Sequence, residues 1–302
     1  MVVRGVEVSD PDKVFFPESG VTKGDVAEYY GRIAETMLPH VRGRCVSMHR
    51  WPDGIEGEDF YQKEAPDYFP DWIRTETVPR KRGGSVRHVV IDDARTLVYL
   101  ADQACLTPHV WLSRAEAPAE PDRLVFDLDP PQGDDGHGED VRWAARRLND
   151  LLRELGLDPS VMTSGSRGFH IHVALIDVAD FEVSRSFARD VSHLLAERHP
   201  ERLTVAQRKQ KRGSRIFLDY LRNGYAQTSV PPYSVRARSG APVAMPIDWD
   251  ELSGVEPRSY DVRNVFRRMG QKTDSWEQLD ETGRGLDEAR EGLDELAAEE
   301  EG

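Results

Sequence analysis

Residues 124–130 read Leu-Val-Phe-Asp-Leu-Asp-Pro, and this alternation of large apolar residues with two acids constrains the fold more than any other feature of the chain. Successive side chains of a β-strand point to opposite faces, so Asp127 and Asp129 share one face and the apolar residues take the other. Two neighbouring carboxylates repel each other unless a cation lies between them. Mg²⁺ and Mn²⁺ are the oxygen-seeking cations that suit such a pair. The alternative is a strand end with two solvated acids before a turn at Pro130.

A glycine-rich turn adds a phosphate-binding signal. Residues 161–164 and 169–175 have the alternation of short strands, and Gly-Ser-Arg-Gly at 165–168 lies between them. The backbone N–H groups and hydroxyls of this turn, with the Arg167 guanidinium, suit a phosphate. An ordinary hairpin turn with a solvated arginine has the same composition. His170, on the second strand, is a possible metal ligand or a histidine hydrogen-bonded to a neighbour.

A third acid, Asp219, lies within the apolar run 215–221, directly after a basic run at 208–215 that holds five cations in eight residues. Three carboxylates on strands, with a phosphate-type turn between them in the sequence, favour a two-metal site for phosphoryl transfer. In that chemistry two cations about 4 Å apart activate the attacking hydroxyl and stabilise the leaving oxygen. The basic run favours contact with a polyanion, although a solvated basic turn is the alternative.

Four motifs then match a known family in order and spacing. They are Phe-Asp-Leu-Asp-Pro at 126–130, Thr-Ser-Gly-Ser-Arg-Gly-Phe-His at 163–170, Leu-Asp at 218–219 and Pro-Tyr-Ser-Val-Arg-Ala-Arg at 232–238. On these motifs the chain resembles the polymerase-domain branch of the archaeo-eukaryotic primase superfamily. That branch includes the polymerase module of the bacterial multidomain DNA ligase D of non-homologous end joining, and stand-alone primase-polymerases. The resemblance covers residues 8–252.

The resemblance implies an α/β fold, a primase-polymerase core in which an RRM-like β-sheet module and an N-terminal α/β module interleave around a central cleft. Hydrophobic periodicity agrees with an α/β class. It predicts helices at 23–38, 140–155 and 184–198, and strands at 86–91, 124–129, 161–164, 169–174 and 215–219. We expect one catalytic domain at 1–270 and an acidic, partly helical C-terminal tail at 271–302. Residues 133–138 are expected to form a mobile loop.

The same resemblance implies a nucleotide site. Asp127, Asp129 and Asp219 would hold two divalent ions, Mn²⁺ or Mg²⁺, and would be the catalytic residues. The residues implied to contact the incoming nucleoside triphosphate are Arg50, His109, Ser164, Ser166, Arg167, His170 and Arg236. Arg167 stands where many relatives carry lysine, and it keeps the charge. A ribonucleotide preference is expected from the family. For His109, a hydrogen-bonded histidine beside a turn remains the alternative.

DNA is the second substrate that the resemblance implies. The residues implied to contact it are Lys13, Lys23, Phe60, Tyr61, Lys211 and Arg212. Lys13 and Lys23 match lysines that bind a downstream 5′-phosphate. Residues 22–25 also have the pattern of a capping box that begins a helix. The two interpretations are compatible, because the start of a helix is itself a phosphate-binding site. Phe60 and Tyr61 would stack on a template base, worth about 1–3 kcal/mol per base, and their charged flanks predict an exposed loop.

Charge and cysteine content limit the remaining possibilities. The net charge is −14, but residues 271–302 hold 12 acidic and 3 basic residues, against 42 and 37 in the rest of the chain. Cys45 and Cys105 are isolated and fit no zinc-ligand spacing. Reduced thiols in a cytoplasm are the simplest expectation. No apolar run has membrane-spanning length and no signal peptide is expected at the N-terminus, so no membrane partner is expected.

These observations predict a template-directed DNA/RNA nucleotidyltransferase that fills short gaps and extends ends in DNA break repair. Its DNA partner would be a gapped or broken duplex with a 5′-phosphate. The chain carries no ligase nucleotidyl-lysine motif, and no nuclease module is expected after residue 252, so we expect joining to require a separate ATP-dependent DNA ligase and a Ku-like protein. The alternatives are a primer-independent primase and a non-catalytic DNA-end-binding protein. A metal-dependent sugar transferase explains neither the basic run nor the aromatic pair.

Overall fold

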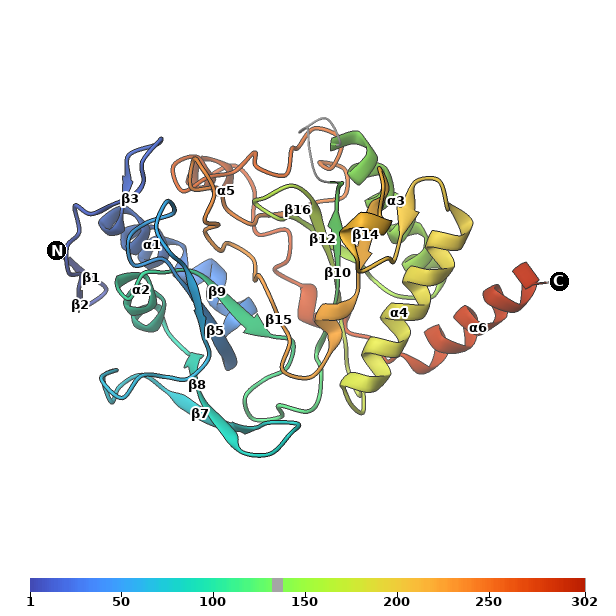
Figure 1. Ribbon diagram of the computed structural model, residues 1–302, viewed down its shortest axis with the longest axis horizontal. Helices are drawn as coiled ribbons and strands as arrows, with labels where there is room; N and C mark the ends of the chain where they lie inside the picture. The colour runs from blue at the N-terminus through green and yellow to red at the C-terminus, as the bar shows by residue number, and fades with distance from the viewer. Residues whose placement is uncertain (132–137, 302) are drawn as a thin grey trace. The chain divides into compact units, whose positions relative to one another are not determined.

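The computed structural model describes residues 1–131 and 138–301, and the chain divides into two compact units that interleave in the sequence. Unit 1 consists of residues 1–118, 228–245 and 258–274. Unit 2 consists of residues 119–227, 246–257 and 275–302. The α/β class predicted from the sequence is confirmed, because each unit contains a β-sheet and helices (Figure 1).

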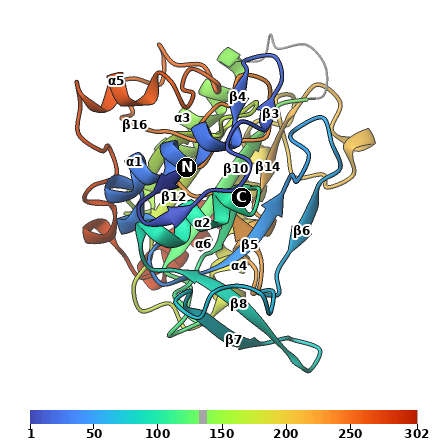
Figure 2. The ribbon, with the colours of Figure 1, turned by 90° about the vertical axis from the view of Figure 1, so that its left-hand side faces the viewer.

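Unit 1 is built on a six-stranded sheet with the order β15-β9-β5-β8-β7, in which β6 pairs with β5. Helices α1 and α2 pack against each other, and α2 also contacts β9 (Figure 1). The β7–β8 hairpin lies at the lower edge of Figure 2. The elements of unit 1 are β1 (Val2–Val3), β2 (Val6–Glu7), β3 (Val14–Phe16), β4 (Val21–Thr22), α1 (Lys23–Val41), β5 (Arg44–Arg50), β6 (Phe60–Gln62), β7 (Thr75–Pro79), β8 (Ser85–Ile91), α2 (Ala94–Asp102), β9 (Cys105–Trp111), β15 (Thr228–Ser229) and α5 (Val265–Met269).

The predicted capping box at the start of α1 is confirmed. The Thr22 side chain accepts a hydrogen bond from the Asp25 N–H, and the Asp25 side chain accepts one from the Thr22 N–H. These reciprocal bonds satisfy N–H groups that a helix leaves free at its first turn. The apolar stripe of α1 is buried, and the helix continues past the predicted end at residue 38 to Val41.

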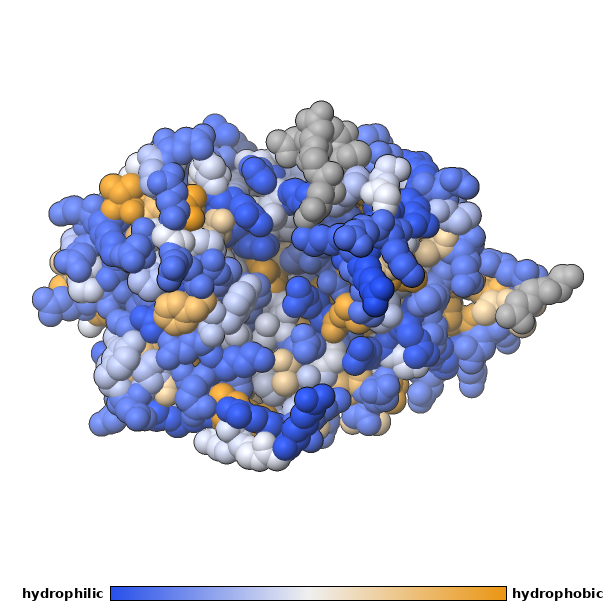
Figure 3. Space-filling view, viewed as in Figure 1, coloured by the Kyte–Doolittle hydropathy of each residue, from blue (hydrophilic) through white to orange (hydrophobic). Residues whose placement is uncertain are grey.

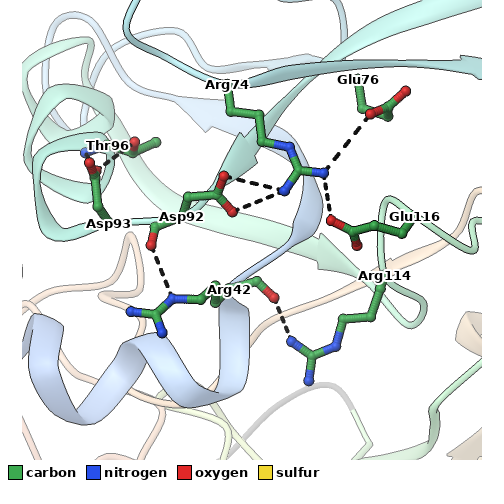
Figure 4. A network of polar contacts seen from close by, with 8 residues as sticks. All are labelled: Arg42, Arg74, Glu76, Asp92, Asp93, Thr96, Arg114 and Glu116. Carbon is green, nitrogen blue, oxygen red and sulfur yellow. Dashed lines mark hydrogen bonds and ion pairs between the residues drawn. The ribbon is translucent and has the colours of Figure 1, made fainter.

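A network of ion pairs in unit 1 joins Arg74, the residue before β7, to the segments that follow β8 and β9 (Figure 4). The Arg74 guanidinium lies 3.3 Å from an Asp92 oxygen and 2.6 Å from a Glu116 oxygen. The hydrogen bond from Arg74 lowers the pKa of Glu116. Arg42 donates to the Asp92 carbonyl, and Arg114 donates to the Arg42 carbonyl. Because these side chains are largely exposed, we expect each pair to contribute at most about 1 kcal/mol.

Unit 2 is built on a six-stranded sheet with the order β13-β14-β10-β12-β11-β16, antiparallel except for the β13–β14 pair. Helices α3 and α4 contact each other and the sheet, so they cover the same face of it (Figure 1). The elements of unit 2 are β10 (Arg123–Asp129), α3 (Gly138–Glu154), β11 (Ser160–Thr163), β12 (Phe169–Ala174), α4 (Phe181–Arg198), β13 (Leu203–Thr204), η2 (Lys209–Lys211), β14 (Ile216–Asp219), η3 (Leu221–Asn223), β16 (Pro246–Ile247), η4 (Leu279–Thr282) and α6 (Asp287–Glu301).

The predicted elements of unit 2 are all present, and their ends differ from the predicted ones by at most three residues. Helix α4 begins at Phe181 rather than 184, because the Asp180 side chain accepts hydrogen bonds from the N–H groups of Glu182 and Val183 and acts as an N-cap. Apart from Gly138, which begins α3, the loop predicted at 133–138 lies outside the described residues.

The C-terminal segment, expected to be an acidic and partly helical tail at 271–302, contains the acidic helix α6 and several buried apolar residues. Trp276, Leu279, Leu286 and Leu293 are buried, and α6 lies beside α4 in unit 2 (Figure 1). Ion pairs join Arg290 to Asp190 and Arg198 to Glu300 on the same two helices. The sparse apolar residues of this acidic segment fall on one stripe of the helix, which gives it a face to bury. Residues 275–302 are therefore part of unit 2.

The face of the molecule drawn in Figure 3 is mostly hydrophilic, with hydrophobic residues in small separate patches. Among the described residues, no helix combines the length and the apolar character needed to cross a membrane.

Candidate active site

The sheet of unit 2 brings the three predicted catalytic acids onto neighbouring strands. In the antiparallel pair of β10 and β14, Asp127 is the Cα partner of Asp219, and Asp129 is the partner of Phe217. The Cβ atoms of directly opposed residues in such a pair are about 4.5–5.5 Å apart. As the alternation predicts, the apolar residues of β10 are fully buried while Asp127 and Asp129 are partly exposed. Asp219 is 8 % exposed.

The pKa of Asp129 reflects how close these acids are to one another. Burial, followed by the charges of Asp127 and Asp219, raises the pKa of Asp129 to about 6, and the guanidinium groups of Arg167 and Arg212 oppose that rise. Each carboxylate thus makes its neighbours harder to ionise. A divalent cation at this position would offset that repulsion, so the donor set suits Mg²⁺ or Mn²⁺.

The ligand oxygens of Asp127, Asp129 and Asp219 nevertheless do not all lie within 4.8 Å of one another, so they are spaced more widely than ligands that already surround one metal ion. Within residues 1–131 and 138–301, the one acidic group whose ligand atoms all lie within 4.8 Å of one another is Asp248, Asp250 and Glu251. These three residues share a turn in which the Glu251 side chain accepts from the Asp248 N–H and the Glu251 N–H donates to the Asp248 carbonyl. The bonds of the turn itself account for their closeness, which sequence reasoning did not anticipate.

The predicted phosphate turn is held by Ser164. Its buried hydroxyl oxygen accepts hydrogen bonds from the N–H groups of Ser166 and Gly168, both at 3.1 Å. Gly165 has a φ of +62°, a left-handed conformation that favours glycine. A Cβ on Gly168 would lie 1.9 Å from the Leu128 carbonyl oxygen, so the turn approaches β10 more closely than any other residue type would allow. Gly165 therefore allows the left-handed turn, and Gly168 allows the turn to lie directly against the strand that carries the acids.

The other predicted nucleotide contacts of unit 2 border the same acids. His170 Nε2 lies 3.5 Å from an Asp127 oxygen, across the Cα pairing of β12 with β10. Arg167 is partly exposed and donates to the Pro131 carbonyl at 3.3 Å. Ser166 is also partly exposed. Ser164, Arg167 and His170 are thus brought to the strand that carries Asp127 and Asp129.

The basic run places one cation beside the acids. Arg212 Nη1 lies 4.0 Å from an Asp129 oxygen, and its guanidinium lies over the Phe217 ring at 3.6 Å from the centroid. Two backbone carbonyls also accept hydrogen bonds from this side chain. Lys211 is exposed in η2. The structure therefore holds Arg212 in a defined position near Asp129 and leaves Lys211 at the surface.

In unit 1, Phe60 and Tyr61 are 44 % and 55 % exposed, as predicted. They lie in the short strand β6 rather than in a loop, because β6 pairs with β5. The Tyr61 ring stacks on His49 with 4.1 Å between centroids, and it meets His109 edge-on at 5.3 Å. The sequence analysis did not predict a role for His49, because no motif includes this residue.

Arg50 belongs to the same surface of unit 1. Its guanidinium donates to the Gln103 carbonyl at 2.7 Å and to the Gln62 side chain at 2.8 Å, and lies 5.5 Å from the Phe60 ring centroid. These bonds fix the side chain against β6. Arg236, the remaining predicted nucleotide contact, is partly exposed and its N–H donates to the Pro242 carbonyl.

The two predicted phosphate lysines have different surroundings. Lys13 is exposed, and its ammonium lies 2.8 Å from an Asp53 oxygen. The Lys23 ammonium is buried between Asp102, at 2.8 Å, and the Ser9 hydroxyl, at 2.7 Å. Burial raises the pKa of Asp102, but Lys23 and the hydrogen bonds from Ser9 outweigh it and leave that pKa below its usual value. A phosphate contact by Lys23 stays a prediction, and the structure gives this lysine an ion pair of its own.

Comparison with known proteins agrees with this arrangement of strands. The polymerase domain of Mycobacterium tuberculosis ligase D, solved in complex with DNA, superposes with a TM-score of 0.84 at 32% identity, over 92% of this chain and 99% of that one. The multifunctional non-homologous end joining DNA repair protein LigD of Mycobacterium tuberculosis is 34% identical over 91% of this chain. The bifunctional non-homologous end joining protein LigD of Bacillus subtilis is 31% identical over 85% of this chain.

Fold and sequence together define a nucleotidyltransferase of the primase-polymerase class. The model of the family described as "LigD, primase-polymerase domain" matches residues 22–276, and the chain belongs to that family. The resemblance drawn from four motifs is thereby confirmed. The chain spans 37% of the length of the Mycobacterium tuberculosis relative and 41% of that from Bacillus subtilis.

Proposed function

We propose that this protein is a template-directed polymerase that adds nucleotides to DNA ends and short gaps during the repair of DNA breaks. The observation that carries the proposal is the convergence of Asp127, Asp129 and Asp219 on adjacent strands, beside a turn shaped for phosphate. The relatives are named for non-homologous end joining, and the structural relative was solved with DNA. A gapped or broken duplex with a 5′-phosphate is the substrate that we expect.

Asp127, Asp129 and Asp219 would hold two divalent ions, Mn²⁺ or Mg²⁺. When bound, such ions activate the attacking 3′-hydroxyl and stabilise the leaving pyrophosphate. The backbone N–H groups of the turn at 165–168 and the Arg167 guanidinium would orient the triphosphate of the incoming nucleotide. Arg212, held beside Asp129, would counter the negative charge of the reacting phosphate.

Unit 1 would supply the remaining contacts to nucleotide and DNA. Arg50, His109 and Arg236 are proposed to contact the nucleotide, Phe60 and Tyr61 to stack on a template base, and Lys13 to contact the downstream 5′-phosphate. Their support is the exposed aromatic surface formed by β5, β6 and β9 and the match of these positions to the family. The same proposal includes a preference for ribonucleotides, a Ku-like partner, cooperation with a DNA ligase and a cytoplasmic location.

Primer extension on a gapped duplex tests the function directly. We expect nucleotide addition that requires Mn²⁺ or Mg²⁺, and we expect it to be faster with ribonucleoside than with deoxyribonucleoside triphosphates. The double variant Asp127→Ala with Asp129→Ala should lose nucleotide addition while it still binds the gapped, 5′-phosphorylated duplex. Full activity of the double variant would contradict the proposed site. An inactive wild-type protein that binds DNA ends would favour an end-binding protein instead, and extension without a primer would indicate a primase.

A further inference from the structure

Strand β14 is shorter than the strand it pairs with, and this leaves a gap in the ladder close to the candidate catalytic acids. The pairing of β10 with β14 runs from Asp129 to Asp127 and ends there, because Asp219 is the last residue of β14. Strand β10 continues beyond this point to Arg123. Alternate residues of a strand direct their N–H and C=O groups to the same neighbour. Val125, two residues before Asp127, therefore directs its backbone N–H and C=O groups toward the position that the next residues of β14 would occupy if the strand were longer.

The side chain of Asn223 fills that place. Its Oδ1 accepts a hydrogen bond from the Val125 N–H at 2.8 Å, and its Nδ2 donates to the Val125 carbonyl at 2.6 Å. A carboxamide carries the same donor and acceptor as a peptide group. Asn223 thus pairs with Val125 as a further residue of β14 would. The side chain is fully buried, so water does not compete for these bonds.

The same side chain also closes the turn that follows Asp219. Asn223 Nδ2 donates to the Tyr220 carbonyl at 2.9 Å, and the Asn223 N–H donates to that carbonyl as well. Within this turn the Leu221 N–H donates to Asp219 Oδ1 at 2.9 Å. The Asp219 carboxylate is therefore oriented by a turn that Asn223 attaches to β10.

We propose that Asn223 is a positioning residue for the candidate metal site. Its carboxamide replaces the missing strand residue, fastens the turn after Asp219 to β10, and so sets the Asp219 carboxylate relative to Asp127. Because the hydrogen bonds of Asn223 go to Val125 and Tyr220, it acts through the backbone of Val125 and through the turn. The inference rests on the proposed function, since it assumes that Asp127 and Asp219 hold the metal.

The test compares Mn²⁺ binding by the wild-type protein and by two variants. Electron paramagnetic resonance of the free ion measures the binding. Asn223→Leu keeps the branched shape of the side chain and removes all three side-chain bonds, and Asn223→Ser replaces the carboxamide by a single hydroxyl. The matched control is Trp249→Phe, which removes one side-chain bond to the Pro159 carbonyl in the same unit. The strands next to these two residues, β16 and β11, are separated from β14 by β10 and β12.

We expect Mn²⁺ affinity to fall about 10- to 100-fold in Asn223→Leu, the range seen when groups that orient metal ligands are removed, and to fall less in Asn223→Ser. The control should bind Mn²⁺ as the wild type does. Hydrogen exchange at the Val125 amide should accelerate in both Asn223 variants and not in the control. In primer extension the variants should require more Mn²⁺ for half-maximal rate.

Three outcomes would overturn the positioning role: wild-type Mn²⁺ affinity in a folded Asn223→Leu protein, an equal loss of affinity in the control, or failure of both Asn223 variants to fold. If the wild-type protein binds no Mn²⁺ and adds no nucleotide, the proposed function itself fails. In that case, faster hydrogen exchange at the Val125 amide in the variants would still show that Asn223 holds this amide. Failure of the proposed function can therefore be distinguished from failure of the positioning role.

Discussion

Asp127 and Asp219 lie directly opposite each other in the antiparallel pair of β10 and β14, although they belong to separate motifs of the sequence. Asp129 lies one step further along the same face, where burial and the two neighbouring acids raise its pKa to about 6. This arrangement concentrates negative charge at one edge of the ladder. Its cost to folding and its value for metal binding can be separated by experiment.

Replacing Asp129 by asparagine should stabilise the metal-free protein. The substitution removes the repulsion with Asp127 and Asp219, and because the Asp129 side chain is 38% exposed, solvent screens part of that repulsion. We expect a gain of about 1 kcal/mol, or roughly 2–4 °C in melting temperature, together with loss of the stabilisation by Mn²⁺. Thermal unfolding with and without Mn²⁺ measures both. Asp150→Asn, at an exposed surface pair, is the control and should change little; a lower melting temperature for Asp129→Asn would contradict the prediction.

Gly168→Ala should disable the phosphate turn. The added Cβ would meet the Leu128 carbonyl at 1.9 Å, so either the turn or β10 must move. We expect a loss of about 1–3 kcal/mol in unfolding free energy and a higher KM for the nucleotide. Gly156→Ala is the matched control, because Gly156 has a φ of +75° and open space around it. The control should cost about 1–2 kcal/mol and leave the KM unchanged; equal KM values in the two variants would argue against a role of the turn in binding.

The buried pair of Lys23 and Asp102 should contribute strongly to stability. Lys23→Met leaves the Asp102 carboxylate buried without its cation, so we expect a loss of about 3–5 kcal/mol. Lys13→Met breaks an exposed pair and should cost at most about 1 kcal/mol. Urea unfolding measures both variants. A similar small loss in the two would show that Lys23 contributes no more than a surface lysine, and would leave phosphate binding as its main role.

The same pair predicts a pH dependence. The pKa of Asp102 in the folded protein lies below its usual value, and the unfolded value is about 3.9. Its stabilisation is therefore complete above the unfolded pKa and is lost as the pH falls through the lower folded pKa. Asp102→Asn should be clearly less stable than the wild type at pH 7, and this difference should shrink below about pH 4. Urea unfolding across pH 3–7 measures it; a difference that grows toward low pH would contradict the assignment.

Tyr61→Ala should weaken binding of a template overhang. If the Tyr61 ring, which stacks on His49, supports one base, its removal costs about 1–3 kcal/mol, or about 5- to 150-fold in affinity. Trp72 is 36% exposed in the same unit, its ring contacts Arg95 and Tyr99, and it is not among the residues predicted to contact nucleotide or DNA, so Trp72→Ala is the matched control. Fluorescence anisotropy with gapped and overhanging DNA measures both variants. Equal losses in the two would show that general aromatic surface, rather than the predicted platform, binds the strand.

Periodicity in the sequence was sufficient to predict the strands of unit 2 that carry the three acids, but it did not predict β5, β6 and β9 of unit 1. Alternation placed Asp127 and Asp129 on one face of a strand, and the strand lies at residues 123–129. The capping box at Thr22 and Asp25 also has local signals, and it was found. These predictions succeed because period-two alternation and helix caps depend on residues only a few positions apart.

The role of the C-terminal segment was harder to predict. Acidic composition indicated a tail, yet Trp276 and Leu293 are buried in unit 2. A few apolar residues among many acids carry little signal until a partner surface is known. Helix α4 supplies that surface here.

By itself, the sequence determined the strands and helices around the three acids, which acids share a face, and the family to which the chain belongs, because these depend on local periodicity and on short motifs. Only the tertiary structure decided that Asp219 lies opposite Asp127, that Lys23 is paired with Asp102, and that Asn223 completes a strand ladder. Strand register and buried polar pairing depend on contacts between residues far apart in the chain, and no local pattern specifies them.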